Sequence, residues 1–190
     1  MGKGRLEAFS DGVLAIIITI MVLELKIPHH GDWHALADLA PVFCGYVLSF
    51  AYVGIYWNNH HHLVHTVKKV TAGVMWANLN LLFWLSLLPF ATGWAGEHTG
   101  EALPAALYGV ILLLAAIAYL ILQTAIVRGG GGVLQRALGS DIKGKVSPLL
   151  YASGIGLAFV RPWISQILYA IVALIWILPD RRIEKELSEA

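Results

Sequence analysis

The feature that most restricts how this chain can fold is a series of long apolar runs separated by short polar breaks. A helix of about 20 apolar residues crosses a bilayer core of about 30 Å and satisfies its own backbone hydrogen bonds there. Of the 190 residues, 58% are hydrophobic and 13% are charged, against about 25% charged in soluble domains. We therefore predict an all-α, polytopic membrane protein whose single domain, residues 1–190, lies in the lipid bilayer. The six expected spans are residues 9–27, 36–57, 70–93, 103–127, 146–160 and 163–178.

The last two spans are separated by the pair Arg161-Pro162. Proline removes a helical hydrogen bond and restricts the residue before it, so one continuous helix is disfavoured there. With six spans, all but two of the thirteen Lys and Arg residues fall on one face. Such residues collect on the cytoplasmic side, which predicts a cell-membrane protein with both termini in the cytoplasm. The cations on that face are Lys3, Arg5, Lys68, Lys69, Arg128, Arg136, Lys143, Lys145, Arg181, Arg182 and Lys185.

A polar cluster lies immediately before the first apolar run. Arg5, Ser10 and Asp11 place a cation, a hydroxyl and a carboxylate at the mouth of the first span. Ionisable groups are costly next to hydrocarbon and commonly serve a partner or a pathway. Ser10 and Asp11 are equally good helix-start residues, because their oxygens accept free backbone amides. The residues alone leave both interpretations open.

One face of the first span groups four residues that could line a pore. At about 100° per residue, Ile16, Ile20 and Leu23 share this face, and Thr19 lies at its edge. Rings of apolar side chains can form a constriction that excludes water. Every face of this helix is apolar, however, so the same stripe is also typical of ordinary packing or lipid contact.

A histidine-rich segment follows the second expected span. His61 and His65 are one helical turn apart and could present two imidazoles to one metal ion. A membrane metal enzyme would need several more histidines on this side, and the other candidates fall on the opposite face. We therefore expect these histidines to pair with Asp11 or Glu7, and we predict no metal site.

Other polar residues favour structural roles. Asn78, Asn80 and Ser86 in the third span can hydrogen-bond to neighbouring helices. The chain has no nucleophile with an adjacent base, no phosphate loop, no carbonyl-filter sequence and no arginine ladder. We predict that it is not an enzyme, that it needs no cofactor and that it has no nucleic-acid partner.

Several short motifs resemble one family of membrane proteins. They are Arg5-x-x-x-Phe9-Ser10-Asp11, the following Thr19, the segment Trp57-x-x-His60-His61, and the run from Asn80 to Phe90. Together they are similar to the transmembrane protein 175 family of lysosomal and prokaryotic potassium channels. The similarity covers the first three spans, and six spans fit the prokaryotic members.

The resemblance implies a homotetramer with a central pore lined by four copies of the first helix. Ile16 would form the narrowest ring, Ile20 and Leu23 further rings, and Thr19 would contribute to cation selection. Such rings offer no polar ligand in place of an ion's water shell, so potassium, which holds water less tightly than sodium, would be modestly preferred. Potassium ions would be the permeant species.

The resemblance also implies a charge-assisted network at the cytoplasmic base of the pore helix. Arg5, Asp11 and His60 or His61 would form it and would fix the helix rather than contact the ion. A proton-coupled small-solute transporter, with Asp11 and His61 relaying protons, is the alternative. A purely structural membrane protein is a third possibility.

Overall fold

The computed structural model describes residues 2–129 and 142–177, and the regular structure in these ranges is helical throughout. The helices are α1 (Lys3–Leu23), α2 (Trp33–Asp38), α3 (Ala40–His65), α4 (Ala72–Ser86), α5 (Leu88–Glu97), α6 (Ala102–Arg128), α8 (Ile142–Ala158) and α9 (Pro162–Ile177). Leu178, the expected end of the last span, lies outside the described residues, as do Arg136, Arg181, Arg182 and Lys185.

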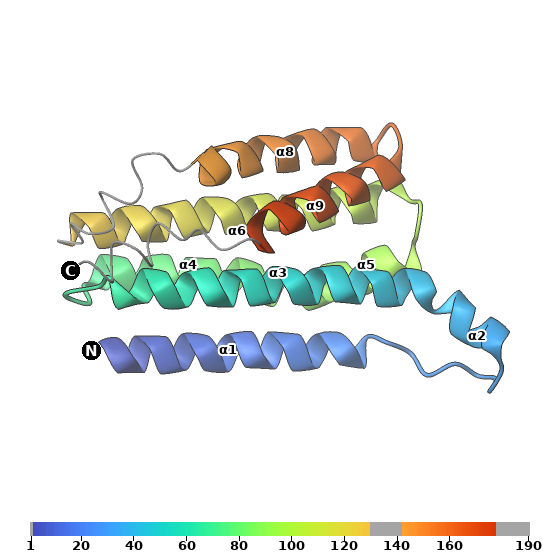
Figure 1. The fold of residues 1–190 in the computed structure, drawn as a ribbon, viewed down its shortest axis with the longest axis horizontal. Helices are drawn as coiled ribbons and strands as arrows, with labels where there is room; N and C mark the ends of the chain where they lie inside the picture. The colour runs from blue at the N-terminus through green and yellow to red at the C-terminus, as the bar shows by residue number, and fades with distance from the viewer. Residues whose placement is uncertain (1, 130–141, 178–190) are drawn as a thin grey trace.

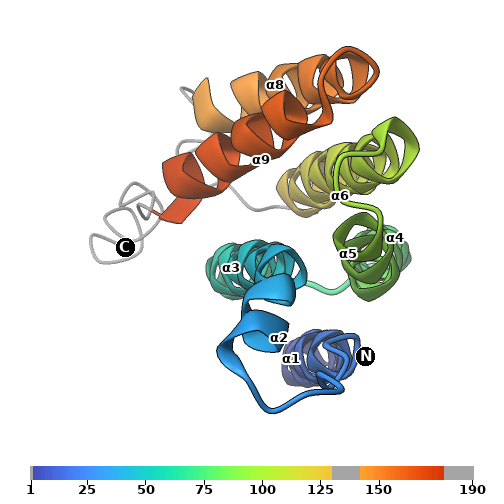
Figure 2. The same ribbon diagram turned by 90° about the vertical axis from the view of Figure 1, so that its right-hand side faces the viewer.

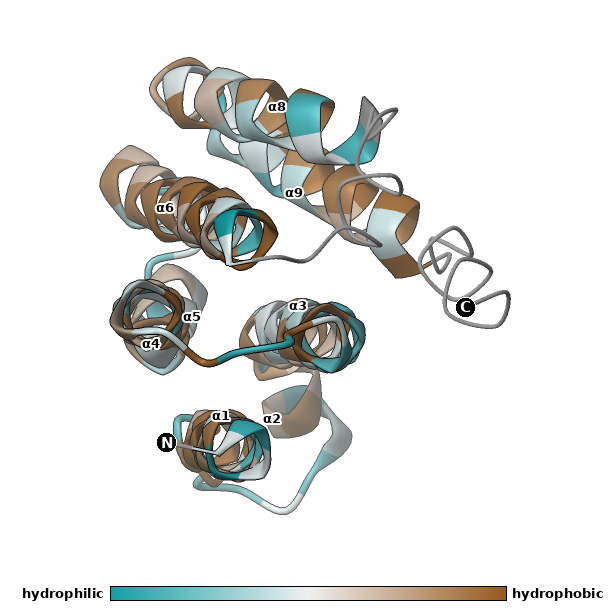
Figure 3. Ribbon diagram, turned by 90° about the vertical axis from the view of Figure 1, so that its left-hand side faces the viewer, coloured by the Kyte–Doolittle hydropathy of each residue, from teal (hydrophilic) through white to brown (hydrophobic). Residues whose placement is uncertain are grey.

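The long helices form a layered bundle with α1 at one edge (Figures 1 and 2). α1 packs mainly against α3, α4 and α5. α6 packs on α4 and α5, and α8 and α9 cover the side of the bundle away from α1 (Figure 2). Polar residues gather where α1 begins and α3 ends, at the end of the bundle that faces the viewer in Figure 3.

Four helical segments of the described chain are long and apolar enough to cross a membrane. They are α1, α3, the α4–α5 pair and α6. α8 and α9, with 17 and 16 residues, are shorter than a typical span. α4 and α5 follow one another with a break at Leu87, because Pro89 in the first turn of α5 cannot continue the hydrogen bonding of α4.

Two helices extend further at their polar ends than the apolar runs suggested. α1 begins at Lys3, so Ser10 and Asp11 lie well inside the helix and their interpretation as helix-start residues is wrong. Its first turns contain Arg, Leu, Glu and Ala, which favour helix, so the helix continues past the hydrophobic boundary. α3 likewise continues to His65, which keeps the histidines on helical spacing.

The connection between α1 and α3 is held at both of its ends. Asp32 caps α2 by accepting a hydrogen bond from the Ala35 amide at 2.8 Å. Lys26 forms an ion pair with Glu97 at the end of α5. The hydrogen bond to Glu97 raises the pKa of Lys26.

Tyr169 of α9 interlocks the outer helices and is fully buried. A Cβ atom at Gly109 of α6 or at Gly154 of α8 would overlap its ring or hydroxyl, so both positions require glycine. Its hydroxyl donates to the Ala105 carbonyl at 3.3 Å, and its own carbonyl accepts from the Tyr52 hydroxyl at 2.5 Å. Tyr169 therefore joins α3, α6 and α8.

Candidate functional site

α1 has one apolar face inside the chain and a second apolar face outside it. Leu6, Ser10, Leu14, Ile17 and Met21 are buried against the neighbouring helices. On the opposite side, the exposed fractions of Ile16, Ile20 and Leu23 are 57%, 43% and 77%. The residues predicted to line a pore thus lie together on a face of α1 that the described part of the chain leaves exposed.

Thr19 lies beside this exposed face. Its hydroxyl donates to the Ile16 carbonyl at 2.9 Å, as threonine commonly does inside a helix. The hydroxyl proton is therefore used within α1, and the oxygen lone pairs remain available as acceptors. Among Ile16, Thr19, Ile20 and Leu23, Thr19 is the polar residue, and its hydroxyl oxygen lies one turn along α1 from Ile16, against the Ile16 carbonyl.

A groove of about 590 Å³ separates α1 from α5 beside this face. Ile16 and Ile20 line it from α1, and Pro89, Phe90 and Trp94 line it from α5. Phe90 is itself 59% exposed. The exposed apolar surface of α1 therefore continues onto α5.

A buried hydrogen-bond chain attaches α1 to α3 and α4. Nε2 of His60 donates to Oδ1 of Asn78 at 2.7 Å, and Nδ2 of Asn78 donates to the Ser10 hydroxyl at 2.9 Å. Ser10 in turn donates to the Leu6 carbonyl at 2.9 Å. The direction of the first bond follows from Asn78, since its amide oxygen can only accept. Ser10, His60 and Asn78 are all almost fully buried, so this chain fixes the position of α1.

Arg5 and Asp11 lie apart from this chain. Oδ1 of Asp11 accepts a hydrogen bond from Nε1 of Trp57 at 3.1 Å. Arg5 is exposed, and it forms no ion pair with any residue of the described ranges. Within one chain, therefore, Arg5, Asp11 and the histidines do not come together as one network.

The histidines divide between two environments. His60 belongs to the buried chain, whereas Nδ1 of His61 lies 3.1 Å from Oε1 of Glu7. Glu7 was one of the two acids expected to pair with this segment. Trp57 and Asn78 make hydrogen bonds that the sequence motifs did not specify. Asn78 hydrogen-bonds to two other helices, as expected for a polar residue of this span. The Ser86 hydroxyl instead donates to a carbonyl within α4.

Comparison with known proteins gives a consistent result. Residues 5–89 match the family model described as endosomal/lysosomal potassium channel TMEM175. A protein of Chryseobacterium sp. named as a potassium channel is 55% identical, over 100% of both chains. A human protein named as an endosomal/lysosomal proton channel, TMEM175, is 36% identical over 103 residues, which are 48% of this chain and 20% of that protein.

The fold comparison agrees with the sequence comparison. The crystal structure of a lysosomal potassium-selective channel TMEM175 homolog from Chamaesiphon minutus superimposes with a TM-score of 0.80. It is 30% identical in sequence and covers 93% of this chain and 96% of that chain.

Proposed function

The chain belongs to the TMEM175 family of ion channels and is not an enzyme, and from this premise we propose that it forms a potassium channel with a modest preference for potassium over sodium. The name of the Chryseobacterium relative, identical at more than half of all positions, supports potassium as the permeant ion. No cofactor is needed for this activity.

The observation that carries the proposal is the exposed aliphatic face of α1. Ile16, Ile20 and Leu23 are exposed in the described part of the chain, whereas five other residues of α1 are buried. Four copies of α1 around a symmetry axis would enclose an aqueous route lined by this face. In a homotetramer, these residues would form successive apolar rings, and the groove between α1 and α5 would receive part of the neighbouring subunit.

The apolar rings would act as both gate and filter. Four Ile16 side chains at the axis give a dehydrated ion no ligand, so conduction requires the ring to widen or the ion to keep its water. Potassium loses water more readily than sodium and would pass more easily. The Thr19 oxygen, with its free lone pairs, would offer an acceptor beside the ring.

We place the beginning of α1 in the cytoplasm of a cell-membrane protein. Lys3 and Arg5 belong to the first turns of α1, and Lys68 and Lys69 to the connection from α3 to α4, which lies at the same end of the bundle (Figure 1), in accordance with the excess of cations on cytoplasmic loops. α8 and α9 would complete the six spans as short helices. Arg5 and Asp11 would then be available for contacts between subunits, since Arg5 is unpaired within its own described chain.

The proposed activity is tested by ion flux into liposomes that contain the purified protein. We expect potassium influx that exceeds sodium influx by a small factor, because no carbonyl ligands enforce strong selection. Proton movement is measured in parallel. Proton flux without potassium flux, or solute uptake coupled to a proton gradient, would instead support the transporter alternative.

The proposed tetramer is tested by cysteine cross-linking at the exposed aliphatic face of α1. In a Cys44→Ser background, which removes the chain's single cysteine, Leu23→Cys should cross-link subunits under oxidation, because four copies would surround the axis. Leu149→Cys is the matched control, since Leu149 is 68% exposed and belongs to α8, which lies away from α1 (Figure 2). Native mass measurement gives the subunit number. A monomeric mass with no Leu23→Cys cross-link would eliminate the axial pore.

A further inference from the structure

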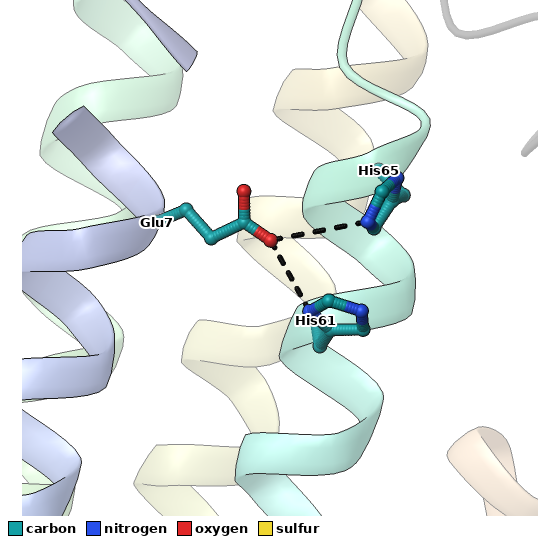
Figure 4. Close-up of side chains that lie close together, drawn as sticks. All are labelled: Glu7, His61 and His65. Carbon is teal, nitrogen blue, oxygen red and sulfur yellow. Dashed lines mark ion pairs between the residues drawn. The ribbon is translucent and has the colours of Figure 1, made fainter. Parts of the chain in front are cut away.

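Three side chains with metal-binding atoms converge where α1 begins and α3 ends. Glu7 projects from α1 toward His61 and His65 on successive turns of α3 (Figure 4). Oε1 of Glu7 lies 3.1 Å from Nδ1 of His61 and 4.0 Å from Nε2 of His65. All three ligand atoms lie within 4.8 Å of one another.

An ion pair does not account for the whole arrangement. At 3.1 Å, His61 can donate a hydrogen bond to Glu7, but 4.0 Å is too long for His65 to do the same. The rings of His61 and His65 have centroids 4.7 Å apart, so both imidazoles lie close to the same carboxylate. Two imidazoles and one carboxylate around a common point are a suitable donor set for a divalent metal.

The distances are close to those of a zinc site. Zinc binds histidine nitrogen and carboxylate oxygen at about 2.0–2.2 Å, which puts neighbouring ligands of a tetrahedron about 3.3 Å apart. The Glu7–His65 separation of 4.0 Å would have to shorten by about 0.7 Å, and the longest separation in the group, at most 4.8 Å, by at most about 1.5 Å. The site is also accessible, because the side chains of Glu7, His61 and His65 are 22%, 44% and 50% exposed.

In contrast to the prediction of no metal site from the sequence, we propose that Glu7, His61 and His65 bind a divalent transition-metal ion of the zinc class, with water as the fourth ligand. Imidazole and carboxylate donors suit zinc and similar ions, whereas calcium and magnesium prefer oxygen ligands. The ion would link α1 to α3 near the point where Lys3 already donates to the His65 carbonyl at 2.8 Å. This proposal depends on geometry alone and does not require the channel to conduct.

The test is zinc binding to tag-free protein, measured by calorimetry and by thermal unfolding with zinc chloride. We expect one zinc ion per chain and a higher unfolding temperature, because a ligand that binds the folded state stabilises it. Magnesium chloride at the same concentration should have no effect. Cobalt in place of zinc should give the visible absorption of a four-coordinate site.

The decisive comparison is between ligand variants and a neighbouring histidine. His65→Gln and Glu7→Gln should each weaken zinc binding at least tenfold, since even indirect changes at metal sites cost about 10–100-fold in affinity. His62→Gln is the matched control and should bind as the original protein does. Unfolding temperatures without zinc verify that each variant is folded, and His65, which is half exposed, gives a second variant if Glu7→Gln is unstable. Equal zinc affinity in His65→Gln and His62→Gln, or no binding by the original protein, would overturn the site.

Discussion

Replacing Ile16 with asparagine is expected to increase sodium permeation through the assembled channel by about tenfold. Four amides at the narrowest ring would offer hydrogen bonds to water and to ions where Ile16 offers none. A net hydrogen bond is worth about 1 kcal/mol, and about 1.4 kcal/mol off a barrier corresponds to a tenfold rate. Potassium-to-sodium ratios from bilayer recordings or liposome flux provide the measurement.

Val22→Asn is the appropriate control for this experiment. Val22 is 45% exposed on the same helix, but it points about 120° away from Ile16. Ile17 would be a poorer control, because it is buried and a polar side chain there would destabilise the fold. If Val22→Asn and Ile16→Asn change the ion ratio equally in intact tetramers, the pore lies elsewhere.

Replacing Asn78 with leucine is expected to cause the largest loss of stability among single polar substitutions in α4. Asn78 links His60 to Ser10, and its loss removes the acceptor of the buried Nε2–H of His60. An unsatisfied buried donor costs about 1–3 kcal/mol. Thermal unfolding in detergent should therefore show a clearly lower transition for Asn78→Leu.

Asn80→Leu serves as the control, since Asn80 is on the same helix and makes no hydrogen bond to other described side chains. Ser10→Ala combined with Asn78→Leu should cost less than the sum of the two changes, because both interrupt one chain of bonds. Additive costs, or equal transitions for the two asparagine variants, would show that the chain does not anchor α1.

The sequence was sufficient to predict the apolar helices but not which polar residues would meet. The four long segments follow from hydropathy, and the wheel of α1 grouped Ile16, Ile20 and Leu23 on the face that the structure leaves exposed. A helix that is apolar on every side gives no periodic signal, so the sequence could not say which face is buried. The last apolar stretch is too long for one span and contains Pro162, which is why α8 and α9 were expected as separate helices.

The polar contacts depend on tertiary packing and are not local. Ser10 and Asn78 are 68 positions apart, and the bond between them depends on how α1 meets α4. The expected association of Arg5, Asp11 and the histidines followed from their common side of the membrane. The side of the membrane cannot distinguish two adjacent histidines of α3. His60 is buried and hydrogen-bonds to Asn78, whereas His61 pairs with Glu7.

The order of the layers determines how independent the two sides of the bundle are. α1 packs mainly on α3, α4 and α5, whereas α8 and α9 lie beyond them. Among the described helices, α8 and α9 pack on α3 and α6, so a change in either reaches α1 through α3, or through α6 and then α4 or α5; the bond from Tyr52 to the Tyr169 carbonyl is one such link. The outer helices can thus diverge during evolution, or adapt to lipids of different thickness, while the surroundings of α1 stay the same.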